Sequence, residues 1–161
     1  MDYLGVANEL IKNIKKQVEI YKELLGLSQK KTDILVMGDV KTLGEITDLE
    51  QELIVRLGRI EDERMKIVAG IAGEEITVSR LAEKLPEDIK LELERISGEL
   101  KEVLSKLRDR NEINEKLIRR ALEYINYSLE IMAGAGKQST GYSADGKTAE
   151  KETIRLIDKR A

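Results

Sequence analysis

Apolar residues recur at alternating spacings of three and four along most of this chain, a rhythm that predicts helices packed side by side. The predicted long helices cover residues 2–36, 40–72 and 87–133, with a connection at 73–86. Between the first two helices, Gly38 suits a left-handed C-terminal cap and Asp39 suits the N-cap of the next helix. In the connection, a short helical turn is expected to start at Thr77 or Ser79, and Pro86 suits the start of the third long helix. The pattern predicts an all-α, antiparallel bundle or coiled coil of three long helices.

The third predicted helix changes character along its length, because a second apolar row joins its main seam near the end. The main seam consists of Ile89, Leu93, Ile96, Leu100, Val103, Leu107, Leu117, Ala121, Tyr124 and Ile131. The second row consists of Ile118, Leu122, Ile125, Leu129 and Met132. At about 1.5 Å per residue the helix would be roughly 70 Å long, enough to extend past the hairpin. The extension is expected to be the end with two rows, which offers more apolar surface than one neighbour covers.

The composition favours a bundle over a sheet and marks a separate C-terminal tail. The 161 residues include no Phe or Trp, so Leu, Ile, Val and Met must fill any core, and the length suits about one domain. After Ala133 the chain is rich in Gly, Ser, Thr and Lys. Residues 134–161 are therefore predicted to form a flexible tail with a weakly amphipathic end.

Several classes of function are disfavoured by what the sequence lacks. Cys and His are absent, which removes disulfides, thiolate metal sites and the commonest general base, so no enzyme, metal or cofactor is expected. Acidic and basic residues are interleaved at a net charge of −3, whereas nucleic-acid binding favours clustered Lys and Arg. A signal-peptide core and an apolar run of about 18 residues are both missing, which predicts a cytoplasmic protein that does not insert into the membrane.

A phosphate-loop pattern occurs in the tail, from Gly141 through Gly146 and Lys147 to Thr148. This motif binds a nucleotide when a strand leads into the loop and a helix follows it, so that backbone amides converge on the phosphates. The residues before Gly141 do not resemble a strand. A Gly-rich tail is therefore favoured over a nucleotide site.

Polar residues interrupt the apolar seams at one level of the predicted bundle. Arg110 and Asn114 occupy seam positions in the third helix, with Asn111 beside them, and Ser28 and Thr32 occupy seam positions in the first. Polar seam residues lower stability and can fix the register of neighbouring helices. A polar layer that aligns the helices is favoured over a ligand site.

One segment begins at Asn111 and Asn114, continues through Leu117, Ile118 and Tyr124, and ends at Gly134. This segment resembles FlgN-type flagellar export chaperones. The motif is Asn-x-x-Asn-x-x-Leu-Ile, followed by an apolar helix and then glycine. Further matching residues, in the same order over nearly the whole chain, are Gly38, Asp39, Leu43, Ile46, Glu50, Gln51, Leu57, Arg64, Thr77, Ser79, Leu81, Tyr142, Gly146, Leu156, Ile157, Asp158 and Lys159.

This resemblance implies a cytoplasmic helical chaperone that holds hook-associated proteins of the hook–filament junction before secretion. Such a chaperone screens the self-assembling helical ends of its client and delivers the client to the membrane export gate. A tail tyrosine is linked to gate docking in that family, and Tyr142 is the matching position, although Tyr142 could instead only pack against the bundle.

The apolar surface of the third helix suits the client's amphipathic helix. The expected client-binding residues are Leu117, Ile118, Leu122, Ile125, Leu129 and Met132. An alternative is a purely structural coiled coil in which the two rows form a homodimer interface.

Overall fold

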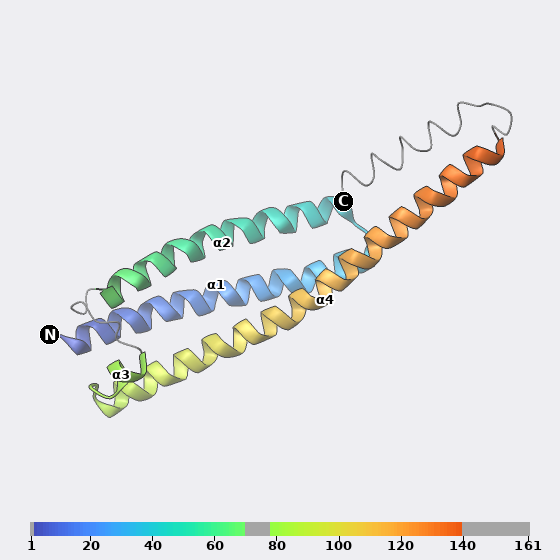
Figure 1. The fold of residues 1–161 in the computed structure, drawn as a ribbon. Coiled ribbons are helices and arrows are strands. Elements are labelled where there is room, and N and C mark those ends of the chain that lie inside the picture. The colour runs from blue at the N-terminus through green and yellow to red at the C-terminus, as the bar shows by residue number, and fades with distance from the viewer. Residues whose placement is uncertain (1, 70–77, 140–161) are drawn as a thin grey trace. The chain divides into compact units, whose positions relative to one another are not determined.

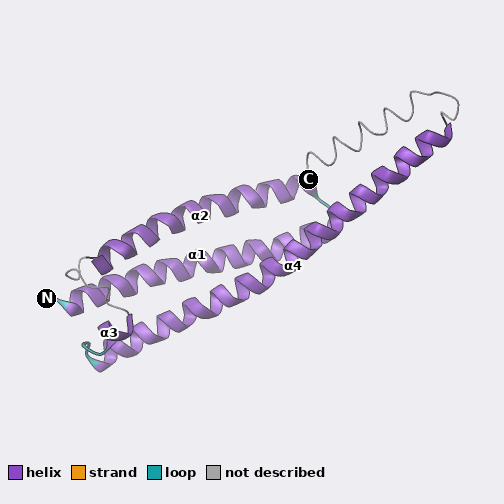
Figure 2. Cartoon of the chain, in the orientation of Figure 1, coloured by secondary structure: helices purple, strands orange, loops and turns teal. Residues whose placement is uncertain are grey.

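A computed structural model describes residues 2–69 and 78–139 of the chain. Its helices are α1 (Tyr3–Met37), α2 (Val40–Ala69), α3 (Val78–Ala82) and α4 (Glu87–Ser139), in that order along the chain (Figure 1). All secondary structure in these residues is helical, as Figure 2 shows, which confirms the predicted all-α class. The chain divides into two compact units, residues 1–117 and 118–161, which are described separately.

A tight turn joins α1 to α2 in the way the sequence predicted. Gly38 adopts a left-handed conformation, with φ of 73°, and its N–H donates to the carbonyl of Ile34 at 2.9 Å. Asp39 then caps α2, since its carboxylate accepts bonds from the Thr42 hydroxyl at 2.6 Å and the Thr42 amide at 3.1 Å. Both hydrogen bonds lower the pKa of Asp39, and the bond from the Thr42 hydroxyl has the larger effect. The turn therefore satisfies both helix ends and sends α2 back along α1.

Helix α1 lies between α2 and α4 in the first unit (Figure 1). It runs antiparallel to α2, because Asn13 bonds to Ile60 while Lys31, further along, bonds to Glu50. It runs parallel to α4, where the corresponding pairs are Lys15 with Glu92 and Ser28 with Asn111. As the central helix, α1 buries ten residues, whereas α2 buries two.

The core consists of two clusters that share α1. The first packs α1 against α3 and α4 through Leu10, Ile11, Ile14, Val18, Leu81, Leu93 and Ile96. The second packs α1 against α2 through Ile20, Leu24 and Leu53, with the half-buried Leu107 of α4 at its edge. Aliphatic side chains supply all the buried members of both clusters, in line with the composition.

Two predicted helix ends need comment. The predicted end of the second helix at residue 72 lies outside the described residues, whereas the short turn expected near Ser79 is α3. The predicted end of the third long helix at Ala133 is wrong, because α4 continues to Ser139 through Gly134 and Gly136. A glycine costs a helix only about 1 kcal/mol relative to alanine, and among the described glycines only Gly38 has the positive φ of a cap.

We predict that Leu93→Ala lowers the free energy of unfolding by about 2–5 kcal/mol, because Leu93 is fully buried in the first cluster and its truncation leaves a cavity. The matched control is Leu91→Ala on the same helix, where the side chain is 56% exposed and the loss should stay below about 0.5 kcal/mol. Urea denaturation followed by circular dichroism measures both. Equal losses in the two variants would contradict the packing described above.

Candidate protein-binding surface

The second apolar row of α4 is exposed in the second unit. Ile118, Leu122, Ile125, Leu129 and Met132 are between 36% and 69% exposed. Leu117, the remaining residue of the predicted client-binding set, belongs to the first unit and is half-buried. Five large apolar side chains at heptad spacing on one helix form a surface of the kind that packs against another helix.

The main seam is also exposed over this part of α4. Tyr124 is 72% exposed and Ile131 is 52% exposed, although both continue the seam that is buried at Leu93, Ile96 and Val103. The client-binding set predicted from the sequence took only Leu117 from the main seam and left these two residues out. The signal that would have included them is their place beside the second row. The exposed apolar face of residues 118–132 therefore includes two residues beyond the predicted client-binding set.

Amide and hydroxyl side chains form a hydrogen-bonded layer where α1 and α4 meet. Asn114 is buried, and its side-chain amide donates to the Ser28 carbonyl at 2.9 Å and to the Ser28 hydroxyl at 3.0 Å. The Thr32 hydroxyl donates to Asn114 Oδ1 at 2.6 Å, and the Ser28 hydroxyl donates to Asn111 Oδ1 at 2.7 Å. Because these groups are matched, the layer fixes the register of α1 against α4 without leaving a buried polar atom unpaired.

Arg110, the other residue assigned to this layer from the sequence, lies in a different environment. It is half-buried and lines a shallow hollow of about 300 Å³ with Leu25, Gln29 and Ile113. The hydrogen bonds of the layer join Ser28, Thr32, Asn111 and Asn114. Arg110 therefore borders the layer, and the amide and hydroxyl groups form it.

A second polar chain, between α1 and α2, was not anticipated from the sequence. The buried Asn13 donates to the Ile60 carbonyl at 2.8 Å and accepts a bond from Gln17 at 2.9 Å. Gln17 also reaches Glu61 at 3.4 Å, and Arg64 donates to Glu61 at 3.0 Å. The Arg64 hydrogen bond holds the pKa of Glu61 below its usual value, against the opposing effect of partial burial. The signal available in the sequence was two amide residues on an otherwise apolar face of α1.

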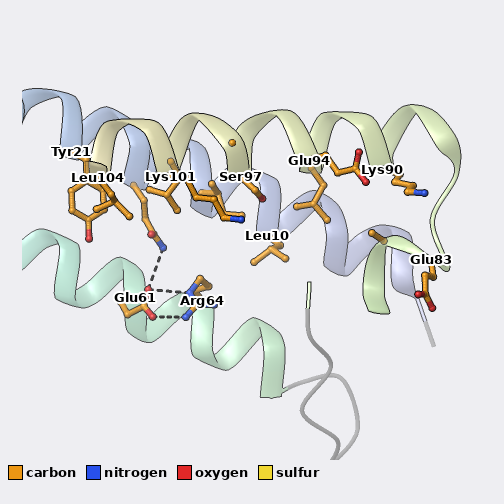
Figure 3. Close-up of a pocket in the computed structure, with 16 residues that line it drawn as sticks. Leu10, Tyr21, Glu61, Arg64, Glu83, Lys90, Glu94, Ser97, Lys101 and Leu104 are labelled. Atoms are coloured by element: carbon orange, nitrogen blue, oxygen red, sulfur yellow. Dashed lines mark hydrogen bonds and ion pairs between the residues drawn. The ribbon is translucent and has the colours of Figure 1, made fainter. Parts of the chain in front are cut away.

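A groove of about 850 Å³ lies beside this polar chain in the first unit. Figure 3 shows Glu61 and Arg64 of α2 on one side and Lys90, Glu94 and Lys101 of α4 on the other, with Leu10 between them. The floor side chains Leu10, Ile14 and Leu93 are already almost fully buried by the bundle. The groove therefore offers a docking helix less uncovered apolar surface than residues 118–132 do.

Some sequence predictions fall outside the described residues. These are Tyr142 and the phosphate-loop pattern from Gly141 to Thr148. Within residues 2–69 and 78–139, no cluster of acidic side chains is suited to a metal ion. Over the same residues, no helix has the length and apolar character needed to cross a bilayer.

The fold places the chain among helical-bundle proteins that carry an exposed coiled-coil surface. A family model described as FlgN protein matches residues 1–150, so the chain belongs to the FlgN family, a family of flagellar export chaperones. It is similar to the uncharacterized protein YvyG of Bacillus subtilis (strain 168), with 31% identity over 159 residues, which is 96% of this chain and 99% of that protein. No solved structure matches the chain significantly. The resemblance noted in the sequence is confirmed.

We predict that Asn114→Ala lowers the free energy of unfolding by about 1–3 kcal/mol, because the Ser28 and Thr32 hydroxyls lose their buried partner. The control is Asn126→Ala, an exposed asparagine on the same helix, which should change stability by less than about 0.5 kcal/mol. Thermal or urea unfolding measures the difference. A neutral Asn114→Ala would show that the polar layer does not contribute to the stability of the bundle.

Proposed function

We propose that this protein is a cytoplasmic chaperone of flagellar type III export that binds hook-associated proteins of the hook–filament junction. It would cover the assembly-prone helical ends of a client until secretion and deliver the client to the export gate. The proposal rests on the family and on one observation, the exposed apolar face of residues 118–132. An apolar helix face recognises an amphipathic helix by packing alone, so the activity requires no chemistry.

The length of α4 supports this role. An isolated helix of about 15 residues is only marginally stable in water, so a free peptide with these two rows would lose conformational entropy on binding. Here residues 118–132 continue a helix of 53 residues whose first part is packed in the bundle. The binding surface is therefore already helical before a client arrives. Such preorganisation favours affinity for a segment that itself folds on binding.

We predict that Leu129→Asp weakens binding of the client's C-terminal helix at least tenfold, because the variant places a carboxylate in the apolar row. The matched control is Leu104→Asp, on the same helix, with the same exposure of 37% and a position on the edge of the groove. Isothermal titration with a peptide of that helix measures the affinity, and circular dichroism checks that both variants fold. Loss of binding in Leu104→Asp alone would move the client site to the groove.

The role of Tyr142 is proposed from the family resemblance, since this residue matches the tail tyrosine linked to gate docking. We predict that Tyr142→Ala keeps client affinity within about twofold and loses binding to the cytoplasmic part of the export gate, because an aromatic anchor often dominates a small interface. Tyr142→Phe should retain most of the gate binding if the ring supplies the contact. Co-sedimentation of the purified client complex with the gate domain measures this. Unchanged gate binding by Tyr142→Ala would rule out the docking role.

A further inference from the structure

The exposed part of α4 carries residues of two adjacent coiled-coil seams. The second row runs through Ile118, Leu122, Ile125, Leu129 and Met132, at spacings of four, three, four and three. The main seam continues through Leu117, Ala121, Tyr124 and Ile131, with the polar Ser128 at the remaining position, at the same spacings and one residue earlier. A helix that meets one partner in a coiled coil uses two positions in every seven. Here four positions in every seven belong to a seam.

The angular width of this surface exceeds what one helix covers. Successive residues of an α-helix are separated by about 100°, so the arc from Leu122 across to Ile131 spans about 180° of the helix. A single-partner seam is much narrower than half of the circumference. The charged residues Lys116, Arg120, Glu123 and Glu130 occupy the opposite half of the helix.

Among the described residues, large side chains on both seams are exposed to solvent. Leu122 and Ile125 on one seam are 55% and 51% exposed, and Tyr124 and Ile131 on the other are 72% and 52% exposed. Together the two rows expose on the order of several hundred Å² of apolar surface, at or above the largest patch of a typical monomer. One docked helix would leave a full row in water.

Within the main seam, the positions nearest the second row carry small side chains, Ala121 and Ser128, which are seven residues apart. Helices that occupy adjacent seams of one helix lie next to each other, and small residues where the seams adjoin leave room for them to make contact. The surface is thus shaped for two helices that also pack on one another.

A second copy of this chain fits the surface less well. In a symmetric pair of these helices, each helix covers the same row of its partner. The other row of each helix therefore stays exposed. Two helices linked in one partner cover both rows with a single loss of translational and rotational freedom.

We propose that residues 118–132 bind a helical hairpin of one client molecule, with one client helix on each seam, to form a three-helix coiled coil of one chaperone and one client. This inference rests on the proposed function, since it names the shape of the client segment. It assigns binding roles to Tyr124 and Ile131 in addition to the second row.

Three consecutive residues supply the test, because each points from the same turn in a different direction. Tyr124→Asp places a carboxylate on the main seam, Ile125→Asp places one on the second row, and Asn126→Asp places one outside both seams. Two probes are titrated against each variant: a full-length hook-associated protein from the same bacterium, and a peptide of its C-terminal helix alone. Analytical ultracentrifugation gives the stoichiometry of the full-length complex.

We expect Tyr124→Asp and Ile125→Asp each to weaken the full-length client tenfold or more, while Asn126→Asp changes affinity less than about threefold. The single-helix peptide should respond strongly to only one of the two seam variants, and the full-length complex should contain one copy of each protein. Loss of binding in Ile125→Asp with normal affinity in Tyr124→Asp overturns the hairpin and leaves the proposed function intact. A complex with two chaperones or two clients also overturns the hairpin. No binding of either probe to the parent protein overturns the proposed function itself.

Discussion

The first unit depends on the enclosure of α1 by two helices at once. Most of its buried residues lie on α1, and both core clusters include that helix. Packing one helix between two others gives apolar burial without a thick core, which suits a chain that has neither Phe nor Trp. Because the apolar seams repeat, the apolar area buried changes little when one helix is shifted along another by a whole repeat. Specific polar contacts therefore set the register. The Asn13 bond and the Lys31–Glu50 pair fix α2, and the Ser28–Asn114 layer fixes α4.

The Lys31–Glu50 pair shows that the burial of an ion pair, more than the number of such pairs, decides how strongly it fixes the register. Its nitrogen and oxygen are 2.9 Å apart and its side chains are only 18% and 15% exposed, so water screens this pair less than it screens a surface pair. The Lys16–Glu63 pair also joins α1 to α2, but it has a separation of 3.9 Å and both side chains are more than half exposed. The more buried pair is therefore the one that discriminates between registers, because leaving either of its charges unpaired would be costly.

The sequence predicted the all-α fold and the turn because both depend on local chemistry. Heptad spacing identifies a helix, and Gly38 and Asp39 identify a turn. The sequence did not predict what depends on tertiary context. The heptad pattern did not identify Tyr124 and Ile131 as members of the binding surface, since they follow the same pattern as the buried Leu93. It also placed the end of α4 at Ala133, because glycine can either end a helix or be accommodated within one.

The change along α4 links the fold to the proposed activity. Around Asn114 the helix is held to α1 by hydrogen bonds, and from Ile118 onward it presents apolar rows to solvent. Exposing these rows to water is unfavourable, and the packing of the first unit offsets this by stabilising the chain. The helix can therefore remain ordered while no partner is bound.

Hydrogen–deuterium exchange of the free protein and of its complex with a full-length hook-associated client tests the central claim most directly. Our account predicts that backbone amides of residues 118–132 exchange more slowly in the complex, while those lining the groove around Leu10 and Leu93 keep their rates. Protection confined to the groove, with unchanged exchange at residues 118–132, would contradict it.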